Sequence, residues 1–235
     1  MKATPMIAGL VAGLVVVGLA VSCAGDPGER AAPEIFDLET GASVGLDPAP
    51  AAEGVVIPAA QLESLLGELL GEHAELVARV MVAAADGDDT AEAVDALQAN
   101  TVELTGAMNT VYGPTGAGAF YQLWGQHTQF FAEYAVASGD GDEGRRDRAY
   151  AKLHDYHIDF ASFADTATGG TAPAEVVVGL LHTHVEDLTR FIDAHTAGDD
   201  AAAEEHLRSA MDYMPVIADA LAGAIAAQDP QRFPG

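Results

Sequence analysis

The chain contains the stretch Leu69-Leu70-Gly71-Glu72-His73, and it repeats this pattern as Leu123-Trp124-Gly125-Gln126-His127 and as Leu180-Leu181-His182-Thr183-His184. Fourteen residues after the last histidine of each stretch comes a Gly-Asp pair: Gly87-Asp88, Gly141-Asp142 and Gly198-Asp199. A match of Leu, His, Gly and Asp at the same offsets, three times over, indicates an internal repeat.

Apolar residues surround each of these histidines with the period of a helix. Around His73 they lie at offsets −7, −4, −3, +4 and +7, and the same offsets are apolar or aromatic around His127 and His184. This is the spacing of one buried helix face, so each histidine is predicted to sit inside the core. Glycine ends a helix in the left-handed conformation and aspartate caps the next one, so each repeat is predicted to be a helical hairpin.

The repeats predict an all-α fold, a helical bundle of three repeated antiparallel helical hairpins with about six helices. We expect the bundle to occupy residues 55–235, with repeats near 57–112, 114–168 and 172–228. The second helices are expected near 89–111, 143–166 and 200–227. Two joints rich in Gly, Thr and Pro, at 113–116 and 169–173, are expected to separate the hairpins.

An antiparallel hairpin also predicts what lies opposite each histidine, because residues equally far from the turn sit at the same height. The positions 13 and 16 residues after each glycine place Asn100 and Glu103 opposite His73. They place His154 and His157 opposite His127, and Met211 and Met214 opposite His184. If the hairpins pack side by side, these nine side chains form one polar layer in an otherwise apolar core.

Three interpretations of this layer stay open. Imidazole, thioether and carboxylate are metal ligands, and thioethers beside imidazoles favour copper over zinc or iron. The candidate ligands are His73, Glu103, His127, His154, His157, His184, Met211 and Met214. The second interpretation is a hydrogen-bonded layer that fixes helix register, and methionine is also ordinary core filler. The third, an enzyme using Glu103 and a histidine, comes last, because the sequence has no nucleophile motif and no cofactor loop.

The composition excludes some partners. The chain has 36 acidic and 10 basic residues, a formal net charge of −26, so it repels nucleic acid and attracts cations. Hydrophobic residues make up 49%, which is enough for a folded core. The single cysteine, Cys23, allows no intramolecular disulfide.

The first residues have the form of an export signal. Lys2 precedes an apolar run up to Val21, which is short for a membrane-spanning helix. The end of this run, Ala20-Val21-Ser22-Cys23, resembles the lipobox of bacterial lipoproteins. The resemblance implies that residues 1–22 are removed as a signal peptide and that Cys23 carries a lipid. Residues 23–54, rich in Ala, Gly and Pro, are then expected to be a flexible linker.

The sequence therefore predicts an extracytoplasmic protein of the cell envelope, anchored to a membrane by the lipid on Cys23, with a metal-binding helical bundle. Copper is the favoured ion. The alternatives are a non-catalytic interaction or scaffold lipoprotein with a structural polar layer, and a metalloenzyme or redox protein. A protein partner is not indicated by any motif. His182, two residues from His184, is expected to point to a different helix face.

Overall fold

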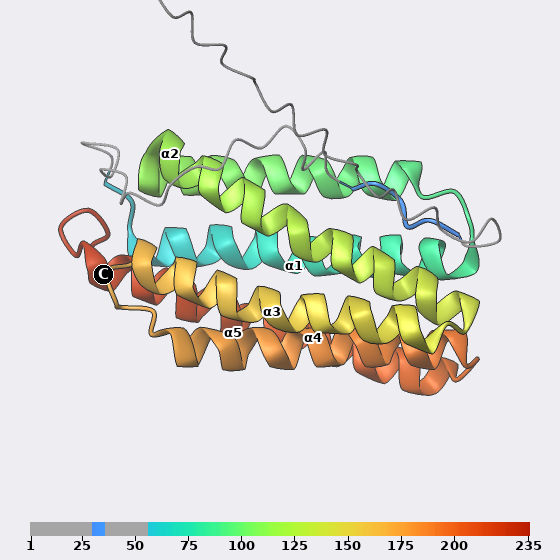
Figure 1. Ribbon diagram of the computed structural model, residues 1–235. Helices are drawn as coiled ribbons and strands as arrows, with labels where there is room; N and C mark the ends of the chain where they lie inside the picture. Colours follow the sequence, from blue (N-terminus) through green and yellow to red (C-terminus); the bar gives the residue numbers. More distant parts are fainter. Residues whose placement is uncertain (1–29, 36–55) are drawn as a thin grey trace, which may run out of the picture.

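The computed structural model describes residues 30–35 and 56–235, and in these ranges it contains five α-helices and no strand. The helices are α1 (Ala59–Asp86), α2 (Ala91–Asp140), α3 (Glu143–Ala167), α4 (Ala174–Thr196) and α5 (Asp200–Gln228). They pack as a bundle (Figure 1), so the all-α prediction is confirmed.

The five helices form a closed ring of neighbours. Helix α1 packs against α2 and α5, α3 packs between α2 and α4, and α4 packs against α5. Helix α4 also reaches α1 and α2 across the bundle. Side chains from α1, α2, α3 and α4 can therefore meet in the interior, which is where the repeated histidines lie.

The turns follow the chemistry that the repeat predicts. Gly87, Gly141 and Gly198 have φ of 77°, 69° and 72°, the left-handed conformation that ends a helix. The carboxylates of Asp142 and Asp199 accept hydrogen bonds from backbone amides in the first turns of α3 and α5. The cap of α2 differs from the prediction, because α2 begins at Ala91 with Thr90 as its N-cap residue.

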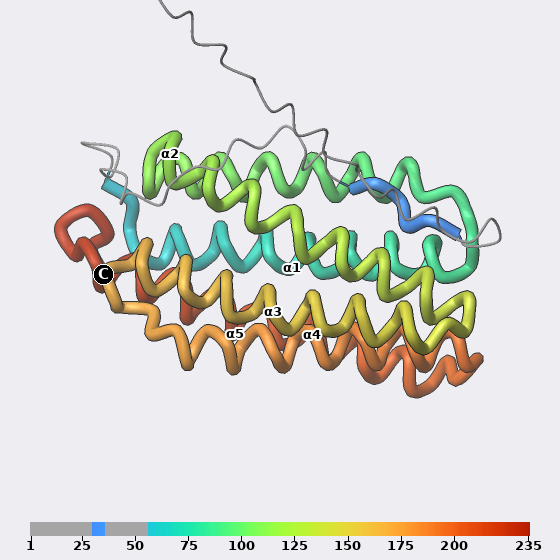
Figure 2. The backbone as a smooth tube through the Cα atoms, viewed as in Figure 1, coloured from blue at the N-terminus to red at the C-terminus, as the bar shows by residue number. Residues whose placement is uncertain are grey.

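The expected sixth helix is part of α2. The range of α2 spans the predicted joint, but Gly113 has φ 72° and ψ 179°, which is not helical, so α2 consists of two helical parts on either side of a kink. The chain reverses direction inside α2, near its label in Figures 1 and 2. Pro114 has no N–H for the carbonyl of Thr110, and the buried guanidinium of Arg232 donates to this carbonyl and, at 2.7 Å, to that of Val111.

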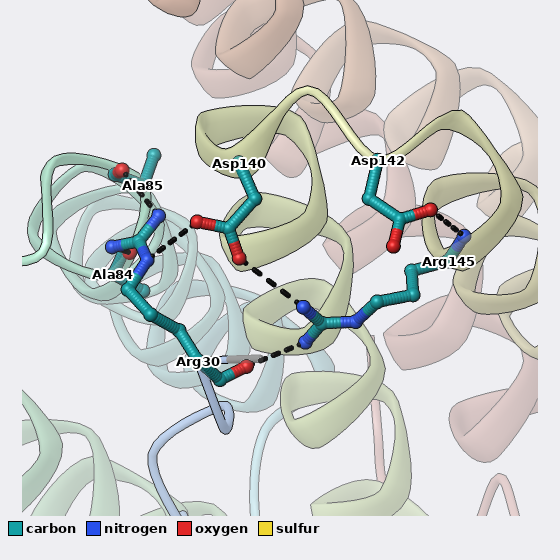
Figure 3. A network of polar contacts seen from close by, with 6 residues as sticks. All are labelled: Arg30, Ala84, Ala85, Asp140, Asp142 and Arg145. Carbon is teal, nitrogen blue, oxygen red and sulfur yellow. Dashed lines mark hydrogen bonds and ion pairs between the residues drawn. The ribbon is translucent and has the colours of Figure 1, made fainter. Parts of the chain in front are cut away.

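A short segment that precedes α1 is hydrogen-bonded to the C-terminal ends of α1 and α2. Figure 3 shows Arg30 donating to the carbonyls of Ala84 and Ala85, at 3.1 Å each, and to the carboxylate of Asp140 at 2.6 Å. Arg145 binds the same carboxylate at 3.1 Å and the carbonyl of Arg30 at 2.7 Å. The guanidinium of Arg30 thus supplies donors to carbonyls in the last turn of α1.

The same segment differs from the flexible linker expected over 23–54. Ile35 is fully buried, its amide donates to Gln129 at 3.0 Å, and its carbonyl accepts from Gln98 at 2.5 Å. Residues 30–35 are therefore docked on the bundle. The expected signal peptide, Cys23 and the rest of the expected linker lie outside the described residues.

Helix α5 is the described helix that is long and apolar enough to cross a membrane by composition alone. In the structure it is a member of the bundle, packed against α1 and α4. Its buried residues, which include Met214, Ile217 and Ile225, face the core of the bundle, and 39% of its apolar window is buried.

Candidate functional site

The structure buries most of the predicted polar layer. His73, His127 and His184, the three repeated histidines, are 1%, 5% and 6% exposed. The second helices add three more buried members: Asn100, His157 and Met214. Glu103 and His154 are exposed and Met211 is half-buried, so the expectation that all nine side chains lie in the core is wrong.

The error has a geometric cause. Residues three apart on a helix differ in direction by about 60°, so both face a narrow core only if they straddle its centre. In the first repeat Asn100 faces inward and Glu103 turns to solvent. In the second repeat His157 faces inward and His154 turns to solvent. The sequence spacing fixes the height of these pairs but not which member is buried.

Two of the buried histidines face each other. The Nε2 atoms of His73, on α1, and His127, on the second half of α2, are 3.1 Å apart. The Nδ1 atom of His73 lies 3.3 Å from Oδ1 of Asn100, and Nδ1 of His127 contacts the carbonyl oxygen of Trp124. The two imidazoles thus stand in a row between two oxygen atoms.

Both end oxygens of this row accept hydrogen bonds and carry no hydrogen. The Trp124 oxygen is a backbone carbonyl. The orientation of Asn100 follows from its amide nitrogen, which donates to the carbonyl of Leu69 at 3.0 Å and to the carboxylate of Glu72 at 3.1 Å. A flipped amide would put its oxygen against these two acceptors.

The row has one hydrogen too few. It contains three contacts, and each needs a hydrogen, but two neutral imidazoles carry only two. If both histidines donate outward through Nδ1, their two Nε2 lone pairs point at each other. An additional cation between these nitrogens, either a proton or a metal ion, removes the conflict.

Burial makes the proton a poor choice. Desolvation lowers the pKa of His73 to about 3, helped by the nearby His184 and opposed by the hydrogen bond to Asn100. Desolvation is the largest cause that holds the pKa of His127 well below its usual value, and the charge of the nearby His73 is the second. Both rings are therefore neutral at pH 7, and each can offer a lone pair to a metal ion without first losing a proton.

Two further buried histidines have nitrogens without a partner. Nε2 of His157, on α3, and Nδ1 of His184, on α4, have no hydrogen-bond partner. Desolvation lowers the pKa of each to about 4, and the charge of His157 contributes to the shift at His184. The charges of His184 and His157 also lower the pKa of His127. These four buried histidines make up the histidine cluster.

Aromatic rings enclose the facing pair. The single tryptophan, Trp124, lies with its ring centroid 4.7 Å from that of His73 and 4.6 Å from that of His127. Tyr156 stacks on His127 at 4.8 Å with an interplanar angle of 19°. This wall excludes water from the pair, which strengthens any interaction between the two lone pairs and a cation.

Three participants of the site were not predicted. The repeat predicts Trp124 only as a member of the apolar face around His127, and no pattern in the sequence singles out Tyr156. His182 was expected to point elsewhere, and it does face away from the core, but its ring lies 6.1 Å from that of His157. Knowing that α3 packs against α4 would have been needed to find this contact.

In the described ranges no group of three or more His, Cys, Asp or Glu side chains already has the arrangement of a metal site. The facing pair is thus a two-ligand arrangement. Comparison with known proteins found no matching family model, no similar curated protein and no similar solved structure.

Proposed function

We propose that the bundle binds one transition-metal ion, with copper favoured, between Nε2 of His73 and Nε2 of His127. The observation that carries the proposal is the row of three contacts with two hydrogens. Histidines that bind metals usually donate their other ring N–H to a carbonyl or carboxylate oxygen, and both histidines have such an oxygen at Nδ1.

The spacing of the pair supports this proposal. A tetrahedral ion with metal–nitrogen bonds of about 2.0–2.1 Å holds two ligand nitrogens roughly 3.3–3.4 Å apart. The observed 3.1 Å is a few tenths of an ångström shorter, a change that small ring rotations supply. His157 and His184 have unpartnered nitrogens but form no ready group of three ligands with the pair, so a further ligand would require a side chain to move or a water molecule to bind.

Copper is favoured over zinc or iron by the kind of donors nearby. The buried members of the layer are neutral imidazoles, the amide of Asn100 and the thioether of Met214, which shares a core cluster with Trp124 and Tyr156, and no buried carboxylate is among the described members. Soft thioether and imidazole donors suit copper, whereas carboxylates suit harder ions. With the lipid on Cys23, which remains a proposal, the protein would buffer, sense or deliver this ion outside the cytoplasm.

The second candidate is an interaction or scaffold lipoprotein in which the layer only fixes helix register. The absence of a ready group of three ligands among the described residues favours it. A metalloenzyme or redox protein would use the same layer, with a labile ligand position on the ion. The three hypotheses predict different metal content and turnover. A metal titration therefore separates the structural scaffold from the metal-binding protein and the metalloenzyme.

The test is metal content and thermal stability of the chain carrying Cys23→Ser, which removes a thiol that would bind copper itself. We expect about one copper ion per chain and, at roughly 100 times the dissociation constant, a rise in melting temperature of about 5–10 °C. The variant His73→Leu/His127→Leu should retain its helical content and hold no tight ion.

The matched control is His195→Ala/His206→Ala, which also removes two histidines but near the turn between α4 and α5. It should bind copper as the parent chain does. If the parent chain takes up no stoichiometric copper or zinc, or if the His73→Leu/His127→Leu variant binds as tightly as the parent, the proposed site is wrong.

A further inference from the structure

An apolar cavity of about 50 Å³ lies in the core, and Trp124 forms part of its wall. Four helices supply the wall: α1, both parts of α2, α3 and α5. Its aromatic members include Phe120, Phe160 and Phe163. No histidine of the described chain lines this cavity, so it is separate from the proposed metal site.

Two polar atoms in this wall have no hydrogen-bond partner in the part of the chain that the structure describes. They are the hydroxyl of Tyr112, which comes just before the kink of α2, and Nε1 of Trp124. The remaining hydroxyl of the wall, on Thr168, is satisfied, because it donates to the carbonyl of Ala164 at 2.7 Å and accepts from a backbone amide at 3.0 Å. The cavity wall therefore holds two polar groups that its own neighbours leave unused.

Both unused groups can donate a hydrogen bond. An indole N–H is a donor only. Burial raises the pKa of Tyr112, against a smaller lowering by Arg232, so the phenol keeps its proton. The indole ring is fixed by its neighbours, since Phe120 stacks on it at 5.1 Å and Phe160 lies at 5.7 Å, both measured between ring centroids. A buried donor without a partner costs free energy, and a ligand that supplies an acceptor recovers it.

The size and lining of the cavity restrict the ligand. No charged side chain lines it, so a charged molecule would lose its water without a compensating partner. An apolar cavity about three times as large holds benzene, so this one takes a group of about two or three non-hydrogen atoms. Water is a poor occupant, because its own hydrogens would face apolar groups. A carbonyl group is small and uncharged, and its oxygen only accepts.

The wall comes close to the surface on one side. Tyr112, Ala167 and Leu221 are half-buried, whereas the other wall residues are buried. Met108 is also part of the wall, and its unbranched side chain adapts easily to a neighbour of a different shape. A ligand longer than the cavity can therefore place its carbonyl end inside and leave the rest toward these half-buried side chains.

We propose that this cavity binds the carbonyl end of a small uncharged molecule, such as a ketone or an ester. The carbonyl oxygen has two lone pairs, one for the hydroxyl of Tyr112 and one for the indole N–H of Trp124. The apolar body of the ligand packs against the aromatic and aliphatic wall. This inference goes beyond the proposed metal binding and does not depend on it, because none of the proposed metal ligands lines the cavity.

The single tryptophan provides a direct test, because its indole N–H gives one signal in a proton–nitrogen correlation NMR spectrum. The full chain carrying Cys23→Ser, kept metal-free by a chelator, is titrated with butanone. The matched ligand is the alkene analogue of butanone, in which a methylene group replaces the carbonyl oxygen. We expect a saturable downfield shift of the indole proton with butanone and binding of the alkene analogue that is about tenfold weaker.

Two matched variants test the donors. Tyr112→Phe keeps the ring and removes one donor, so it should bind butanone about three- to tenfold more weakly than the parent chain does. The control is Tyr156→Phe, which removes another buried hydroxyl without a partner, but one that does not line the cavity. It should bind butanone as the parent chain does.

Three outcomes would overturn the carbonyl site: no saturable shift with butanone, equal binding of butanone and its alkene analogue, or unchanged butanone affinity in Tyr112→Phe. All of these measurements are made on the metal-free chain. Failure of the carbonyl site is therefore distinct from failure of the copper site, which the metal titration decides.

Discussion

The two halves of the buried histidine cluster are built differently. His73 and His127 have a contact at every ring nitrogen, and their outer nitrogens meet the oxygens of Asn100 and Trp124. His157 and His184 each keep one buried nitrogen without a partner. Hydrogen-bond contacts thus hold the first half in a fixed orientation, whereas each ring of the second half has one nitrogen that no hydrogen bond fixes.

This difference assigns different parts to the two halves. Rings whose outer nitrogens are fixed are preorganised to bind an ion at the inner nitrogens. A buried polar atom without a partner costs about 1–3 kcal/mol, and a ligand that bonds it recovers this free energy. We therefore expect His73 and His127 to set the affinity for the ion, and His157 and His184 to contribute less to it.

The largest expected effect is on stability at low pH, and it involves both halves. The pKa of His73 is lowered to about 3 and that of His184 to about 4, from an ordinary value of 6.5. Between these values the unfolded chain binds protons that the folded chain does not. Stability is therefore fully present above about pH 6.5 and is lost as the pH falls toward 4.

For the metal-free chain, urea unfolding at pH 7 and pH 5 should show a loss of about 2 kcal/mol for each fully buried histidine. The variant His184→Leu should lose about 2 kcal/mol less than the parent between these pH values, because one such group is gone. The variant His206→Ala is the control and should follow the parent. An equal loss in His184→Leu and the parent would mean that His184 is not buried as described.

The next effect is on copper affinity, and it concerns His73 and His127, the two rings with a contact at every nitrogen. Replacing Asn100 by Leu removes the oxygen that faces Nδ1 of His73, while every proposed ligand stays in the chain. Groups that orient a metal-binding histidine in this way contribute about 10–100-fold to affinity. We expect the copper affinity of Asn100→Leu to fall by that factor, measured by competition with a chelator of known affinity.

The matched substitution is Glu103→Leu, one turn further along α2 and exposed. It should leave the copper affinity unchanged, because Glu103 points to solvent. If Asn100→Leu and Glu103→Leu bind copper equally well, Asn100 does not orient His73 for the ion.

The fold and the three repeated histidines were predictable because they rest on local rules. A period of 3.6 residues places His73, His127 and His184 on buried faces, and Gly87, Gly141 and Gly198 adopt the left-handed turns that glycine alone adopts easily. These features occur in all three repeats, so the prediction for one repeat supports the prediction for the other two.

The rest depends on how the helices are rotated and which ones are neighbours. Whether Asn100 or Glu103 faces inward is a matter of about 60° of rotation, which the packing of α2 on α1 decides. The contact of His182 with His157 requires α3 beside α4, and the binding of Arg232 at the reversal of α2 joins residues more than 100 positions apart. No periodicity in the sequence encodes these relations.

The smallest expected effect tests the unpartnered half directly. Leu in place of His184 removes a buried nitrogen that has no partner and keeps an apolar side chain of similar size in the core. Apolar replacement of an unsatisfied polar group is neutral or stabilising, so the metal-free chain should gain about 1 kcal/mol at pH 7. Leu in place of His73 has the opposite sign, because it removes the one N–H of His73 and leaves a buried acceptor, either Oδ1 of Asn100 or Nε2 of His127, without its donor. Urea unfolding of both variants in the presence of a chelator measures the two signs, and a loss of stability in both would remove the distinction between the halves.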